Sequence, residues 1–351
     1  MTRKTVITLL FILAIVCGGF FYLVSNPPSK TSALKSLAQS QNVDMVHALW
    51  DKHQEELGNH DDFVLAIKEK LISFNLSKTE LNDCKTWLPE PPTSFNLIIV
   101  PDLSNRIIDI QNNPHQIERD RTILRAIWKS FVAHTKLKSN SKDHIMITIA
   151  DRRQANGQFD KVADGLICDL SANTKGVNRL FFTPYRQSKF YKNIDKLYDL
   201  AEPHPSDADF FQFFESRLPS LLKSSDLFHQ YDNKLIILTD GYITPKNQLT
   251  QKRINHWLAN NQVDFNAQKL QTRMHQTLQK QAKISHAYSE LDVLVCEVNA
   301  ETESSLYHQT ALHSYWQLWL ENMSIKSPII LDRDYATSET TKTIDAFIGD
   351  H

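Results

Sequence analysis

Two short polar segments of this chain carry side chains whose types and spacing suit metal chemistry. The first reads DLSNR over residues 102–106, and the second reads TDG over residues 239–241. Two carboxylates with nearby hydroxyls are hard oxygen donors, which suit Mg²⁺ or Ca²⁺ with water in the remaining positions. Ser104 lies two residues after Asp102, so its hydroxyl can turn towards the same ion. A simpler alternative is that each acid caps a helix or braces a turn, since Asp-Gly is a common turn pair.

Each polar segment directly follows an apolar run that predicts a strand buried on both faces. Similar runs elsewhere predict further strands, of which 165–170 is the weakest and a candidate antiparallel edge strand. The predicted strands are 96–100, 144–150, 165–170, 234–238, 292–298 and 328–332. Apolar stripes at helical spacing predict helices at 117–132, 187–201, 207–223, 312–323 and 340–348. This alternation predicts an α/β domain with a doubly wound, mostly parallel sheet.

The two acidic segments should meet at one edge of that sheet. Ligands of such sheets bind in the crevice beyond the carboxyl ends of the strands. Asp102 and Asp240 both end strands that are expected at the centre of the sheet. The sequence therefore predicts a shared site in which Asp102, Ser104 and Asp240 hold Mg²⁺ or Ca²⁺.

The segments LIIVPDLSNRI (97–107) and KLIILTDGYI (234–243) resemble the von Willebrand factor A (vWA) domain with its metal-ion-dependent adhesion site. That family carries an Asp-x-Ser-x-Ser loop, a Thr before the third helix, and an Asp in a T-D-G-like turn. Asp102, Ser104 and Asp240 match three of these positions. The resemblance covers about residues 94–350. It implies a Rossmann-like vWA fold and a module that binds or scaffolds a protein partner through the metal ion.

The match to the vWA site is degenerate. The third loop position is Arg106, whose guanidinium would replace the cation or repel it. The family Thr has no unambiguous counterpart. The two options are Ser206 and Thr183, and Ser206 is also a candidate N-cap of the 207–223 helix. Thr239 adds a hydroxyl beside Asp240.

Two other functions stay open beside the binding module. Haloacid-dehalogenase-like phosphatases and phosphotransferases also begin with an apolar strand that ends in a nucleophilic Asp, and Asp102 fits that role with Asp240 helping to hold Mg²⁺. That family usually has a second Asp two residues later, where this chain has Ser104. The third option is a vestigial A domain without metal, in which Arg106 occupies the cation site and the role is structural.

The N-terminus predicts a membrane anchor. Residues 5–24 carry no charge, and 20 helical residues span the ~30 Å hydrocarbon core. Arg3 and Lys4 precede this run, which favours a cytoplasmic N-terminus and places the main domain outside the inner membrane, in a periplasm or at a cell surface. The run exceeds the apolar region of a cleaved signal peptide. We expect an anchor at 1–28, a spacer and helical membrane-proximal segment at 29–93, and the vWA-like domain at 94–351.

The composition and the absence of certain motifs argue against several classes of function. The 39 Lys plus Arg against 40 Asp plus Glu give no electrostatic case for nucleic-acid binding. Only 8 glycines in 351 residues, and no GxxxxGK[ST], HExxH or GxSxG motif, argue against phosphate loops, zinc proteases and serine hydrolases. The mixed clusters at 119–121 and 151–153 are interpreted as solvated faces. Residues 246–287 are polar and predict a helical insertion, while Cys168 and Cys296 lie in apolar runs and are expected to be buried.

Overall fold

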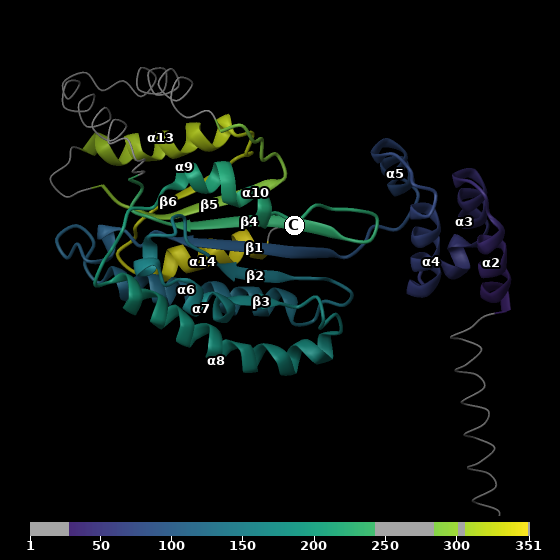
Figure 1. Cartoon of the computed structure of the whole chain (residues 1–351), viewed down its shortest axis with the longest axis horizontal. Helices are drawn as coiled ribbons and strands as arrows, with labels where there is room; N and C mark the ends of the chain where they lie inside the picture. Colours follow the sequence, from purple (N-terminus) through teal and green to yellow (C-terminus); the bar gives the residue numbers. More distant parts are fainter. Residues whose placement is uncertain (1–27, 243–283, 301–305, 350–351) are drawn as a thin grey trace, which may run out of the picture. The chain divides into compact units, whose positions relative to one another are not determined.

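The structure, a computed structural model, describes residues 28–242, 284–300 and 306–349 (Figure 1). The predicted membrane segment at 5–24 and nearly all of the predicted insertion at 246–287 lie outside the described residues. Within the described ranges, no helix is both long enough and apolar enough to cross a membrane.

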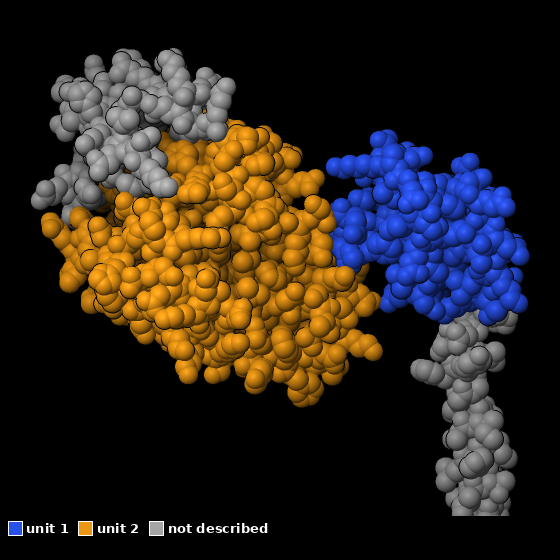
Figure 2. All heavy atoms as spheres, in the orientation of Figure 1, with its two compact units in different colours: residues 1–91, 225–230 blue, residues 92–224, 231–351 orange. Residues whose placement is uncertain are grey.

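The chain divides into two compact units (Figure 2). Unit 1 comprises residues 1–91 together with 225–230, and unit 2 comprises residues 92–224 and 231–351. The described helices of unit 1 are α2 (Pro28–Gln39), α3 (Val43–Leu57), α4 (Asp61–Ile72) and α5 (Lys78–Lys85). Their apolar faces enclose a small core that includes Trp50, Phe63 and Leu227. The helices expected in this segment are therefore present, and residues 225–230 complete their core. The spacer expected before them differs, because Pro28–Gln39 is helical and adds Ala33 and Leu37 to the same core.

Unit 2 contains a six-stranded sheet in the order β3-β2-β1-β4-β5-β6. The order places β1 and β4 at the centre of the sheet, as the sequence predicted. The strands are β1 (Thr93–Pro101), β2 (His144–Ile147), β3 (Ile167–Asp169), β4 (Gln230–Leu238), β5 (Leu291–Val298) and β6 (Ile329–Asp332).

The sheet is mostly parallel. Strand β1 pairs with β2 in parallel, and β4–β5 and β5–β6 are also parallel pairs. The short strand β3 runs antiparallel to β2 at the edge of the sheet, which confirms the expectation for 165–170. Cys168 on β3 and Cys296 on β5 are free thiols and fully buried, as expected.

Helices cover both faces of the sheet, so it is doubly wound (Figure 1). One face packs against helices that supply a core including Trp128, Leu197 and Ile344: these are α6 (Gln116–Thr135), α7 (Asp160–Ala163), α8 (Gly176–Ala201) and α14 (Thr337–Gly349). The other face packs against α9 (Phe210–Gln212), α10 (Leu218–Leu221) and α13 (Leu306–Asn322). The predicted aromatic stripe of 312–323 lies in this second core.

Two helices differ from the prediction at prolines. Helix α8 begins at Gly176, eleven residues before the expected start, and continues through Pro184. The segment predicted as one helix at 207–223 is divided, because a π-helical turn at Phe213–Arg217 separates α9 from α10. Pro219 lies in the first turn of α10, where its missing N–H is tolerated, and it cannot donate a hydrogen bond back into the π-helical turn.

Candidate functional site

The polar segments after β1 and β4 leave the sheet side by side. The backbone N–H of Asp102 donates to the carbonyl oxygen of Leu238, the last residue of β4, over 2.8 Å. On the other side of β4, the N–H of Asn299 donates to the carbonyl oxygen of Asp240 over 2.9 Å. The structure thus brings the chain at Asp102 and at Asp240 to neighbouring strand ends at the carboxyl edge of the sheet.

The carboxylate of Asp102 is held by donors from both segments. Its Oδ1 accepts the backbone N–H of Ser104 over 3.0 Å, and its Oδ2 accepts the hydroxyl of Thr239 over 2.9 Å. Asp102 is 1% exposed. Burial raises the pKa of this carboxyl, while the Arg106 guanidinium and the hydroxyls of Thr239 and Ser104 act in the opposite direction. Thr239, a secondary candidate from sequence, is therefore a direct partner of Asp102.

The T-D-G turn after β4 depends on its glycine. Gly241 has φ +97°, and a Cβ on it would lie 2.8 Å from Cγ1 of Val298. The carbonyl oxygen of Gly241 accepts the indole N–H of Trp316 over 3.1 Å, which ties the turn to α13. Asp240 is half-buried, and its Oδ1 accepts the N–H of Tyr242 over 3.2 Å. A residue with a side chain at position 241 would strain the turn that carries Asp240.

Ser206 lies next to the Asp102 loop, but Thr183 does not. The N–H of Ser206 donates to the carbonyl oxygen of Leu103 over 3.2 Å. The expected role of Ser206 as a helix N-cap is wrong, because Asp209 caps α9 by accepting the N–H of Gln212. Helix capping therefore does not account for Ser206. The serine is hydrogen-bonded to Leu103, which lies between Asp102 and Ser104 in the chain.

Thr183 points into the core of unit 2. Its hydroxyl donates to the carbonyl oxygen of Arg179 within α8 over 2.9 Å, and it is 3% exposed. Arg179 in turn pairs with Asp143 over 2.6 Å, and Asp143 directly precedes the first residue of β2. Because β2 is parallel to β1, that end of β2 lies at the edge opposite to Asp102. The structure thus separates Thr183 from the other candidates.

Arg106 is enclosed at the sheet edge, beside the ends of β1 and β4. Its side chain is 1% exposed. The Nε donates to the carbonyl oxygen of Asp102 over 2.8 Å, and one terminal nitrogen donates to the carbonyl oxygen of Leu238 over 3.1 Å and to Asp120 Oδ2 over 2.6 Å. Its Nε lies 4.0 Å from Asp102 Oδ2. The guanidinium therefore braces the loops from beneath, with Asp120 as its closest counter-ion.

The expectation of solvated faces at 119–121 and 151–153 is wrong for Asp120 and Asp151, which are 0% and 9% exposed. The 119–121 cluster was interpreted as a solvated face, yet Asp120 is fully buried. It accepts the hydroxyl of Tyr198 over 2.8 Å and the side-chain amide of Gln116 over 2.9 Å. Burial raises the pKa of Asp120, and Arg106 lowers it. The available signal was its position: Asp120 falls between Ile117 and Leu124 on the apolar stripe of α6.

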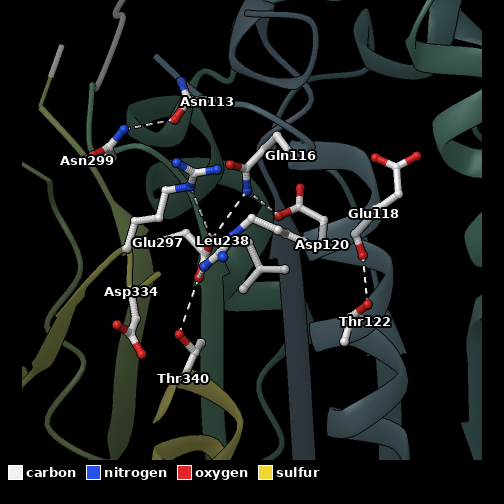
Figure 3. A network of polar contacts seen from close by, with 12 residues as sticks. Asn113, Gln116, Glu118, Asp120, Thr122, Leu238, Glu297, Asn299, Asp334 and Thr340 are labelled. Carbon is white, nitrogen blue, oxygen red and sulfur yellow. Dashed lines mark hydrogen bonds and ion pairs between the residues drawn. The ribbon is translucent and has the colours of Figure 1, made fainter. Parts of the chain in front are cut away.

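The polar network continues from Asp120 to the end of β5 (Figure 3). Gln116 also approaches Glu297, over 3.5 Å. Glu297 is 1% exposed and accepts two hydrogen bonds from Arg119, over 2.8 and 2.9 Å, and one from the hydroxyl of Thr340 over 3.2 Å. Helix α6, strand β5 and helix α14 are thus joined through the buried carboxylate of Glu297.

The donor chemistry at this edge fits a hard cation. Two carboxylates, from Asp102 and Asp240, and the hydroxyls of Ser104 and Ser206 are the oxygen ligands that Mg²⁺ and Ca²⁺ accept. The described residues contain no group of three or more His, Cys, Asp or Glu side chains that could hold a metal. A site here would therefore depend on hydroxyls and water to complete its ligands.

Comparisons with known proteins do not identify the chain. Models of known protein families give no match to it. The curated proteins likewise give no significant match.

Proposed function

We propose that unit 2 is a vWA-like binding module that engages an acidic group of a protein partner through Mg²⁺ or Ca²⁺. The observation that carries this proposal is the placement of Asp102 and Asp240 at the ends of the neighbouring central strands β1 and β4, with the N–H of Asp102 on the carbonyl oxygen of Leu238. Ser104 and Ser206 supply hydroxyls next to the same loop. Such a cation would present a positive charge to a carboxylate of the partner.

The position of Arg106 favours this proposal over one in which the guanidinium fills the cation site. Arg106 is held 2.6 Å from Asp120, and its side chain is almost fully enclosed. Its charge is therefore shared first with Asp120, and then with Asp102 and Asp240. Arg106 stands where the vWA pattern has a serine. In this proposal, that replacement changes how the Asp102 loop is held in place and leaves the proposed metal ligands unchanged.

One observation favours the alternative of a vestigial, metal-free domain. Both oxygens of Asp102 already accept hydrogen bonds, from Ser104 and from Thr239, and the carboxylate is 1% exposed. Each carboxylate oxygen has a second lone pair, so these bonds do not by themselves prevent ligation. The same enclosure does not favour Asp102 as the nucleophile of a phosphatase, which needs an oxygen open to substrate.

The proposal keeps the membrane tether predicted from residues 5–24. In it, the chain is a single-pass protein of the inner or cytoplasmic membrane with a cytoplasmic N-terminus. Unit 2 then faces the periplasm or the cell exterior and meets its protein partner there. A reporter fused to the C-terminus tests this orientation, because a cytoplasmic signal would contradict it.

Calorimetric titration of the full chain with Mg²⁺ and with Ca²⁺ tests the metal site. We expect binding that is lost in Asp240→Asn and weakened in Ser104→Ala, since each removes an oxygen ligand. Asp160→Asn is the matched control, because Asp160 is an exposed acid on α7 of the same unit. A partner pull-down with and without chelator then connects the ion to binding.

Three results would overturn the proposal. If the native chain binds neither ion, the structural alternative stands. If Asp240→Asn and Ser104→Ala bind the ion as well as Asp160→Asn does, the ion lies elsewhere. Turnover of an aryl phosphate that disappears in Asp102→Asn would instead establish the phosphatase.

A further inference from the structure

Helix α8 carries an apolar face that points to solvent. Val177, Leu180, Phe181 and Tyr185 are 66%, 49%, 79% and 76% exposed. They follow the spacing i, i+3, i+4 and i+8, so they lie on one side of the helix. Leu137 is 74% exposed and belongs to the same region, because a Cβ on Gly176 would lie 3.5 Å from the Cα of Leu137. We refer to these five side chains as the α8 patch.

The α8 patch is not part of the fold's own core. The opposite side of α8 packs against the sheet side of unit 2 through buried residues that include Phe190, Ile194 and Leu197. In Figure 1, α8 is the outermost helix on its face of the sheet. Single exposed apolar residues are ordinary, but a contiguous set on one helix face marks a surface that meets another apolar phase.

The charged residues along the stretch of chain that carries most of the α8 patch have one sign. Between Asp169 and Asp195 the chain has five Lys or Arg residues and no Asp or Glu, although its overall net charge is −1. Lys175, Lys189 and Lys192 on this stretch are exposed, as is Lys136 beside Leu137. Arg179 and Arg186 are engaged inward, with Asp143 and with backbone carbonyls respectively. The exposed cations therefore flank the apolar side chains along the chain, with no acidic residue between Asp169 and Asp195.

We propose that the α8 patch rests on the surface of an anionic phospholipid bilayer. A helix with a cationic rim and exposed aromatic side chains lies in the interface plane, with its apolar side chains at the headgroup–acyl boundary. Phe181 and Tyr185 enter that boundary, and Lys189 and Lys192 meet the lipid phosphates. Juxtamembrane lysines are each stabilised near an anionic surface. The predicted anchor would raise the local lipid concentration, but the surface is independent of the proposed metal site.

An environment-sensitive probe on the full chain tests this proposal. Ser188 is exposed and adjoins Lys189, so Ser188→Cys carries a bimane label next to the patch. The chain is reconstituted into nanodiscs of phosphatidylcholine alone or with phosphatidylglycerol. We expect a blue shift of emission, and quenching by spin-labelled lipid, only in the anionic discs. High salt should reverse both, because it screens the charges. The unsubstituted chain, taken through the same labelling, gives the background from native cysteines.

Two double variants test the apolar side chains and the lysines of this surface separately. We expect Leu180→Ser/Phe181→Ser to abolish the blue shift, and Lys189→Glu/Lys192→Glu to weaken the association by about tenfold or more. Tyr335→Ser is the control for the first, since Tyr335 is a fully exposed aromatic residue of the same unit. Unchanged urea midpoints in all variants establish that they fold.

Several results would overturn the membrane assignment. An emission maximum that is the same in neutral and anionic discs excludes anionic lipid as the occupant. A blue shift that appears in detergent and grows with protein concentration identifies a second copy of the chain instead. Loss of the response in Tyr335→Ser as well as in the patch variants shows that the probe does not report on α8.

Discussion

The buried pair of Arg106 and Asp120 gives the most demanding test of the structure. Asp120→Asn keeps the size of the side chain and removes its charge. Asp199→Asn is the matched control, because Asp199 also pairs with an arginine, Arg121, over 2.8 Å, but is 66% exposed. Both substitutions therefore remove the negative charge of an aspartate paired with an arginine, in one case in a buried pair and in the other in an exposed pair.

The expected magnitudes differ several-fold. In the pair of Arg106 and Asp120 the side chains are 1% and 0% exposed, and removing one charge from such a pair costs about 3–5 kcal/mol. Asp120 also accepts hydrogen bonds from Tyr198 and Gln116, and the new amide nitrogen would face one of these donors. The exposed pair of Asp199 should contribute at most about 1 kcal/mol. Replacing both charges, as in Arg106→Met/Asp120→Leu, should recover stability relative to Asp120→Asn.

Hydrogen exchange of the β1 and α6 peptides across a urea series measures these free energies. This assay follows unit 2 alone, so unfolding of unit 1 does not contribute. A loss in Asp120→Asn that is no larger than the loss in Asp199→Asn would refute the buried ion pair. Arg106 would then be free to fill the cation site, and the vestigial-site alternative would regain its basis.

Three further predictions concern the turn after β4, the pH dependence of the site and a histidine at the start of β2. Gly241→Ala should destabilise unit 2 by about 1–3 kcal/mol in the same exchange assay, because φ +97° and the contact with Val298 both oppose a Cβ. Burial raises the pKa of Asp102, and ligation requires the carboxylate, so titration calorimetry should show Mg²⁺ affinity falling as the pH decreases through that pKa; a constant affinity would contradict the role of Asp102. Burial lowers the pKa of His144 from 6.5 to about 4, so the folded chain keeps this ring neutral while the unfolded chain takes up a proton. The contribution of neutral His144 to stability is therefore fully present above about pH 6.5 and is lost as the pH falls towards 4, by up to about 3 kcal/mol. His144→Asn should flatten that part of an acid-unfolding curve. The exposed control His204→Asn should not.

Much of the architecture could be predicted from hydrophobic periodicity. The apolar runs before Asp102 and Asp240 were identified as central strands, because a strand covered on both faces has no polar side. Helix limits were less predictable at Pro184 and Pro219. One proline lies within α8 and the other follows a π-helical turn, and this difference depends on the packing around each helix rather than on the proline itself.

The candidate site was predicted in part. Asp102, Ser104 and Asp240 were chosen because they follow the strands, and their placement needs only the rule that parallel strands end at one edge. Ser206 could not be assigned from sequence, since a serine before a helix resembles a cap. The capping by Asp209 excludes the cap, and the backbone bond to Leu103 places the serine beside the Asp102 loop.

The sequence by itself determined the alternating α/β pattern, the central strands and the acids that end them. Local periodicity and turn residues are sufficient for these features, because they depend on neighbours along the chain. The tertiary structure decided the direction of Arg106 and the burial of Asp120 and Glu297. These charges are paired between the loop after β1, helix α6 and strand β5, and no local pattern specifies which distant carboxylate will neutralise a buried guanidinium.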